Sequence, residues 1–132
     1  MRNSTSEAFR SYQVNNTTCA APPGAEVGFT VSAPGTVLVM ATTTIYFLHT
    51  IGNSGDAALE LSMSSAGCSG YYQYAWVDSS QPTAHYFTSV SLVQTFTIST
   101  AGTYTFYLLG YEPYQDTAYY YSLTIVGEYD PS

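Results

Sequence analysis

The sequence predicts an all-β fold, an antiparallel β-sandwich of about eight strands for which a jelly roll is the expected architecture. Apolar and polar residues alternate over most of the 132 residues, and turn-forming residues separate the alternating runs at regular spacing. The runs are rich in Thr, Tyr and Val, which suit a pleated, half-buried surface. A chain of this length is expected to fold around one core.

The clearest pattern runs from residue 90 to residue 109, and we expect the fold to be organised around it. It consists of two alternating stretches separated by Ser99-Thr100-Ala101-Gly102, where the glycine permits positive φ. We therefore predict a β-hairpin that turns at these residues. Its core-facing side chains are expected to be Val90, Leu92, Phe96 and Ile98 on one arm and Tyr104, Phe106 and Leu108 on the other.

The remaining strands are expected at residues 26–32, 36–50, 57–64, 71–77, 84–88 and 118–126. The run at 36–50 is either one long bent strand or two short ones, and a helix is the alternative for residues 56–63. Within 57–64 we expect Met63 to face the core and Glu60 to face outward. Tyr119 and Tyr121 are in phase with Leu123 and Ile125, so we expect them to share the core-facing side.

We expect an N-terminal arm, residues 1–24, and a β-sandwich domain, residues 25–132, because residues 1–24 are polar and then turn-like at residues 20–24, and charge sets the first ten apart. The net charge is −7, and both basic residues, Arg2 and Arg10, lie in the first ten positions. An acidic surface repels phosphate, so we expect no nucleic-acid partner. The arm is expected to reach an acidic surface of its own or a neighbouring subunit and to add little to the core. A disordered tail is the equal alternative.

Several features bear on where the protein acts. No apolar run is long enough for a membrane span, and the start lacks the apolar stretch of a signal peptide, so we expect a piece of a longer precursor or assembly inside a cell. Low charge with abundant Tyr and Thr favours an extracellular or virion-surface location. Cys19 and Cys68 either pair in a disulfide, worth roughly 4 kcal/mol, or remain free thiols.

Three segments carry a resemblance to known proteins: GTVLVMA at 35–41, FTISTAGTYTFYL at 96–108 and YYYSLTIVG at 119–127. From about residue 36 to residue 126 the pattern resembles the jelly-roll modules of phage and viral fibre or surface-appendage proteins, and more distantly the C1q/tumour-necrosis-factor type. The resemblance implies a non-catalytic, commonly trimeric surface module for attachment, decoration or assembly. This chain lacks a collagen-like or coiled-coil stalk.

The sequence offers no catalytic or metal-binding motif, and we predict a protein that is not an enzyme and needs no cofactor. Residues 67–70, GCSG, do not match the G-x-S-x-G nucleophile motif. His49 is in phase with Ile45 and Phe47, which favours a core histidine, and His85 is expected at a strand end. Two histidines at this spacing do not make a zinc site.

Aromatic residues beside amides and carboxylates are the remaining signal. Sugar rings stack on Tyr or Trp while polar groups bind their hydroxyls. Two such sets predict a surface glycan site: Tyr111, Glu112, Tyr114, Gln115 and Asp116 in one loop, and Tyr71, Gln73 and Trp76 near another. The leading function is therefore a self-assembling structural or adhesive module, forming a trimer or filament, and a lectin-like carbohydrate-binding module is the alternative.

Overall fold

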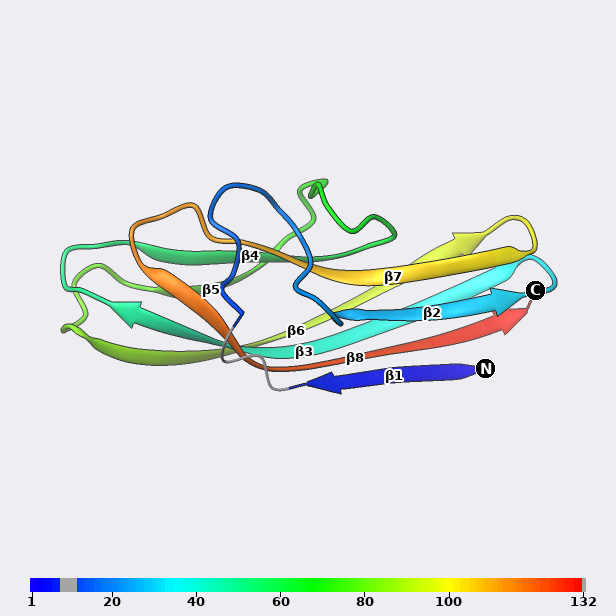
Figure 1. Cartoon of the computed structure of the whole chain (residues 1–132), viewed down its shortest axis with the longest axis horizontal. Coiled ribbons are helices and arrows are strands. Elements are labelled where there is room, and N and C mark those ends of the chain that lie inside the picture. The colour runs from blue at the N-terminus through cyan, green and yellow to red at the C-terminus, as the bar shows by residue number, and fades with distance from the viewer. Residues whose placement is uncertain (8–11, 132) are drawn as a thin grey trace.

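The computed structural model describes residues 1–7 and 12–131. Its eight strands are β1 (Arg2–Glu7), β2 (Glu26–Val31), β3 (Gly35–His49), β4 (Gly55–Ser62), β5 (Gln73–Val77), β6 (Ala84–Ile98), β7 (Gly102–Tyr111) and β8 (Thr117–Pro131). They form two antiparallel four-stranded sheets, sheet A in the order β1-β8-β3-β6 and sheet B in the order β2-β7-β4-β5. Figure 1 shows the two sheets as two layers. This strand order is that of a jelly roll, so the predicted fold class is confirmed.

The core lies between the sheets and follows the predicted alternation in β2 and β3. In β3 every second residue from Val37 to His49 is buried, so residues 35–49 form one long strand rather than two. β-branched residues dominate this strand because they lose little side-chain freedom on a pleated surface. Among the described residues there is no helix, and hence none that could span a membrane.

The predicted hairpin at residues 90–109 is wrong. β6 pairs with β3 in sheet A, whereas β7 pairs with β2 and β4 in sheet B, so residues 99–101 connect one sheet to the other. The rings of Phe96 and Phe106 consequently meet across the core, with centroids 5.0 Å apart. Alternation reveals which side of a strand is buried, but it carries no information about which strand lies beside it.

The N-terminal residues belong to the sandwich. β1 pairs with β8 of the same chain, with Arg2 opposite Glu128. Farther along, the Val14 amide donates to the Ala118 carbonyl at 2.8 Å, and the Val14 side chain is completely buried, contrary to the expectation that residues 1–24 add little to the core. Arg10 lies outside the described residues. The arm's reach toward a neighbouring subunit stays a prediction.

A β-bulge in β8 decides which tyrosines face the core. The register between β3 and β8 shifts between Thr44 and Ile45, so β8 contains one more residue than β3 there. Tyr120 therefore points inward and is buried, while Tyr119 and Tyr121 lie on the outer side of sheet A. The prediction that Tyr119 and Tyr121 face the core is wrong because the bulge breaks the two-residue period.

Candidate functional site

In the loop between β7 and β8, most of the predicted glycan-binding residues are buried or hydrogen-bonded within the protein. Glu112 is 1% exposed, and its Oε1 accepts hydrogen bonds from the amides of Tyr114 at 2.9 Å and Asp56 at 3.3 Å. Burial raises the pKa of Glu112, against the opposing effect of these two donors. Gln115 accepts from the Ser54 amide at 2.7 Å, and Tyr111 is half-buried. Within this set, Tyr114 is the tyrosine whose side chain is well exposed, at 55%.

Asp116 forms a buried pair with His49. His49 Nδ1 contacts Asp116 Oδ2, and its Nε2 donates to the Gln81 carbonyl at 3.1 Å. The Thr50 amide donates to Asp116 Oδ1 at 3.4 Å. The pair thus joins three loops at one end of the sandwich, and the prediction of a core histidine is confirmed. Among the described residues no three His, Cys, Asp or Glu side chains are grouped so as to hold a metal ion.

Glu60 on β4 was missed by sequence reasoning. It lies on the outer side of sheet B, as its parity predicts, but it is only 2% exposed. Its carboxylate accepts hydrogen bonds at 2.9–3.1 Å from the backbone amides of Ser69, Gly70 and Tyr71 and from the Ser69 hydroxyl. The one signal in the sequence is an acidic residue inside an apolar run. Met63, expected in the core, is exposed.

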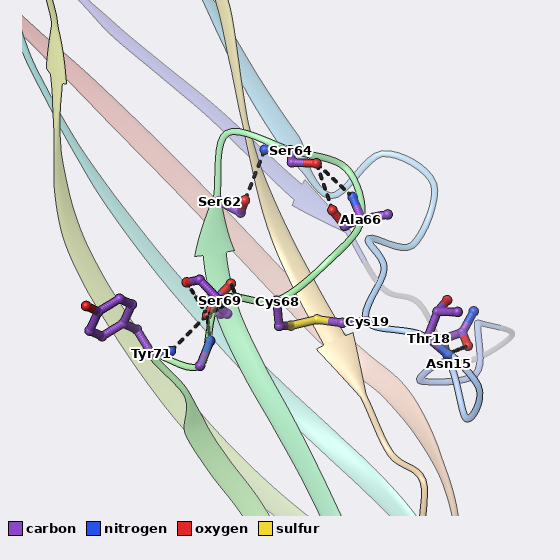
Figure 2. The surroundings of a disulfide bond; sticks show 11 residues. Asn15, Thr18, Cys19, Ser62, Ser64, Ala66, Cys68, Ser69 and Tyr71 are labelled. Carbon is purple, nitrogen blue, oxygen red and sulfur yellow. Dashed lines mark hydrogen bonds between the residues drawn. A yellow bond between two sulfur atoms is a disulfide. The ribbon is translucent and has the colours of Figure 1, made fainter.

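A disulfide fixes the same loop from its other side. Cys19 and Cys68 are joined by a disulfide (Figure 2), with their Cα atoms 5.5 Å apart. The Gly67 amide donates to the Cys19 carbonyl at 2.8 Å. Ala20 bridges both Ala66 and Gly110. We call residues 63–72 the pinned loop, because Glu60 and the disulfide hold it over the outer side of sheet B.

The pinned loop forms one wall of a groove of about 920 Å³ between the edges of the two sheets. Tyr71 and Gln73, both predicted as glycan-binding residues, line this groove, and Tyr71 is 80% exposed. Trp76, the third predicted residue of this set, is not among the lining residues. It faces outward from β5 together with Tyr74, because Ala75 and Val77 are the residues of β5 that face the core.

The outer side of sheet A, which we call the open face, is different in character. In the described part of the chain its charged side chains, Arg2, Glu128 and Asp130, lie near the end that holds both termini. The rest of the face carries Thr, Ser, Tyr and aliphatic residues from β3, β6 and β8. Its exposed apolar side chains are Leu38, Met40, Leu48, Phe87 and Val93.

Four aromatic rings on the open face line a pocket of about 270 Å³. They belong to Tyr46, Phe87, Tyr119 and Tyr121. The Tyr46 and Phe87 ring centroids lie 4.9 Å apart, and those of Phe87 and Tyr121 lie 5.0 Å apart. The Tyr46 hydroxyl and His85 Nδ1 form a hydrogen bond of 2.6 Å, which fixes one wall of the pocket.

Comparison with known proteins finds no matching family model and no match among curated proteins. Among solved structures, the chain is similar to the Eiger TNF of S. frugiperda, with 10% identity, 96% of each chain covered and a TM-score of 0.42. It is also similar to the C-terminal CBM6 of the laminarinase LamC from Zobellia galactanivorans, with 15% identity, 93% of this chain and 98% of that chain covered and a TM-score of 0.33.

A third similar structure is that of infectious bursal disease virus, Gx strain, with 9% identity, 96% of this chain and 33% of that chain covered and a TM-score of 0.34. The jelly-roll architecture of this chain follows from its own strand order.

Proposed function

We propose that this protein is a non-catalytic structural or adhesive module, extracellular or on a virion surface, that self-associates through the open face of sheet A. The observation that carries the proposal is a broad sheet face on which apolar and aromatic side chains are exposed and charge is confined to one end. Soluble monomers seldom expose large contiguous apolar patches, and the centres of protein interfaces are depleted of charge and enriched in aromatic residues.

The aromatic pocket gives such an interface a centre. Tyr46, Phe87, Tyr119 and Tyr121 surround a space that a side chain of a second copy can enter, and rigid rings lose little conformational entropy on binding. A contact between copies of one chain closes into a ring, such as a trimer, or continues as a filament, depending on the rotation between neighbours. The disulfide is in keeping with an oxidising location outside the cell.

Light scattering coupled to size-exclusion chromatography tests this proposal over a concentration series. The intact chain is expected to elute as a discrete oligomer or polymer rather than at its monomer mass of 14.3 kDa. Phe87→Lys places a charge beside the aromatic pocket, where it would lose its water on association, so it is expected to give monomers. Because Phe87 is 55% exposed, the variant should remain folded.

The matched control is Tyr74→Lys. Tyr74 is 53% exposed, nearly the same as Phe87, but it lies on the outer side of sheet B. This variant is expected to keep the mass of the intact chain. A monomeric intact chain, or equal loss of association in both variants, would contradict the proposal.

A further inference from the structure

We infer that the groove between β5 and β6 is a binding site for a neutral oligosaccharide. It lies at the edge of the open face, with which it shares Met40 and Val93. The groove is an opening of the sandwich itself. β5 is the edge strand of sheet B and β6 is the edge strand of sheet A, and the lining comes from both. Buried Leu61 and Leu92 lie at its apolar base.

The polar walls of the groove follow from strand parity. Tyr71 and Gln73 continue the inward-facing series of Ala75 and Val77, and Gln94 continues that of Leu92. These side chains therefore extend the inner faces of the two sheets beyond the closed core, where they meet solvent instead of each other. The volume, about 920 Å³, is within the range of small-molecule sites.

The more exposed of the two tyrosine rings in the groove belongs to the pinned loop. Tyr71 is 80% exposed, yet its backbone amide donates to Glu60 at 2.9 Å, and Cys68, three residues earlier, is in the disulfide. In Figure 2 the Tyr71 ring projects away from the disulfide, on the far side of the loop. Holding the backbone in place lowers the entropy lost when the ring meets a ligand. An exposed ring on a fixed backbone is suited to stacking against a ligand.

The lining selects the chemical class of the ligand. It combines the rings of Tyr71 and Tyr72 with the amides of Gln73 and Gln94, and none of the described residues that line it is charged. Aromatic faces accept the apolar C–H faces of sugars, and side-chain amides both donate to and accept from sugar hydroxyls. The net charge of −7 disfavours an anionic polysaccharide. The lining therefore favours a neutral oligosaccharide rich in hydroxyl groups.

The test is a nuclear magnetic resonance titration of the intact, disulfide-bonded protein with cellohexaose, maltohexaose and mannohexaose, and with an oligogalacturonate as the anionic comparison. At least one neutral hexasaccharide is expected to shift the amide signals of residues 71–73 and 92–94, while the oligogalacturonate leaves them in place. Tyr71→Ala and Gln94→Ala are each expected to weaken that binding by about tenfold or more.

Tyr114→Ala is the matched control, since Tyr114 is an exposed tyrosine of the other predicted glycan set and does not line the groove. It should leave the affinity unchanged. The inference is overturned if no neutral hexasaccharide shifts the groove signals, or if Tyr114→Ala and not Tyr71→Ala abolishes binding. A change of native mass in Tyr71→Ala would also overturn it, because it would show that a second copy covers the groove.

Discussion

The outer side of sheet B is partly covered by the chain, whereas the outer side of sheet A is exposed to solvent. On sheet B, the pinned loop folds over Glu60, and Leu109 on the neighbouring strand is completely buried. On sheet A, residues at equivalent outward positions, such as Phe87 and Val93, are more than half exposed. The chain thus supplies a cover for one outer surface, while the other keeps apolar side chains in water.

The difference shows how a cover changes what an outward position can hold. A carboxylate on a covered face is stable only if the covering backbone supplies donors, as residues 69–71 do for Glu60. The open face needs no such donors, but it exposes apolar area whose burial would be favourable. We therefore expect substitutions on the covered face to change folding and those on the open face to change association.

The largest effect on folding is expected from removing the disulfide. Replacing Cys19 and Cys68 together by Ser frees a loop with a sequence separation of 49 residues. The free energy of unfolding should fall by about 4 kcal/mol on the chain-entropy model. Urea unfolding of monomers measures it, with Phe87→Lys as the common background. A loss below about 1 kcal/mol would contradict the importance of the pinned loop as a cover.

Glu60→Ala is expected to cost about 3 kcal/mol, because the backbone amides of Ser69, Gly70 and Tyr71 lose the buried carboxylate that accepts their hydrogen bonds. Glu60→Gln keeps one acceptor oxygen and should cost clearly less. The measurement is again urea unfolding. Equal losses in the two variants would show that packing around the side chain matters here and its hydrogen bonds do not.

Glu112→Gln tests the buried carboxyl of the loop after β7. Burial raises the pKa of Glu112 above its usual value, so the ionised form costs stability at neutral pH, and this cost disappears as pH falls through the folded-state pKa. The variant should be more stable than the intact chain by about 0.5 kcal/mol at pH 7, a small value because the amides of Tyr114 and Asp56 offset part of the cost of burying the charge. Thermal unfolding between pH 4 and pH 7 should show this gap closing toward the acid end; a constant or widening gap would be the contrary result.

The smallest effect on folding is expected on the open face. Val93 is 67% exposed, so Val93→Thr should change the free energy of unfolding of the monomer by less than about 0.5 kcal/mol. The same variant should weaken self-association, because it reduces the apolar area available to a partner. Leu109→Ala, on the covered face, is the contrasting control and should cost about 3 kcal/mol. A large loss of monomer stability in Val93→Thr would remove the distinction between the faces.

The two predicted glycan sets lie in different surroundings, and their role in binding stays a prediction. Tyr71 and Gln73 line a groove, but the pattern could not reveal that Glu112 and Asp116 are buried by loops distant in the chain. Nor could it reveal Glu60, whose donors lie in a loop that local alternation describes only as small and polar. These residues depend on which segments come together in space, and a local period does not encode that.

The sequence by itself determined that this is an all-β protein, with Val27, Phe29 and Val31 and the long series from Val37 to His49 facing a core, because side-chain alternation is a property of each strand alone. Tertiary structure decided the rest. It separated β6 and β7 into different sheets, placed the pinned loop over Glu60, and used one bulge residue to turn Tyr119 and Tyr121 onto the open face. Pairing, covering and register depend on contacts between distant residues, so these features become visible only in the folded chain.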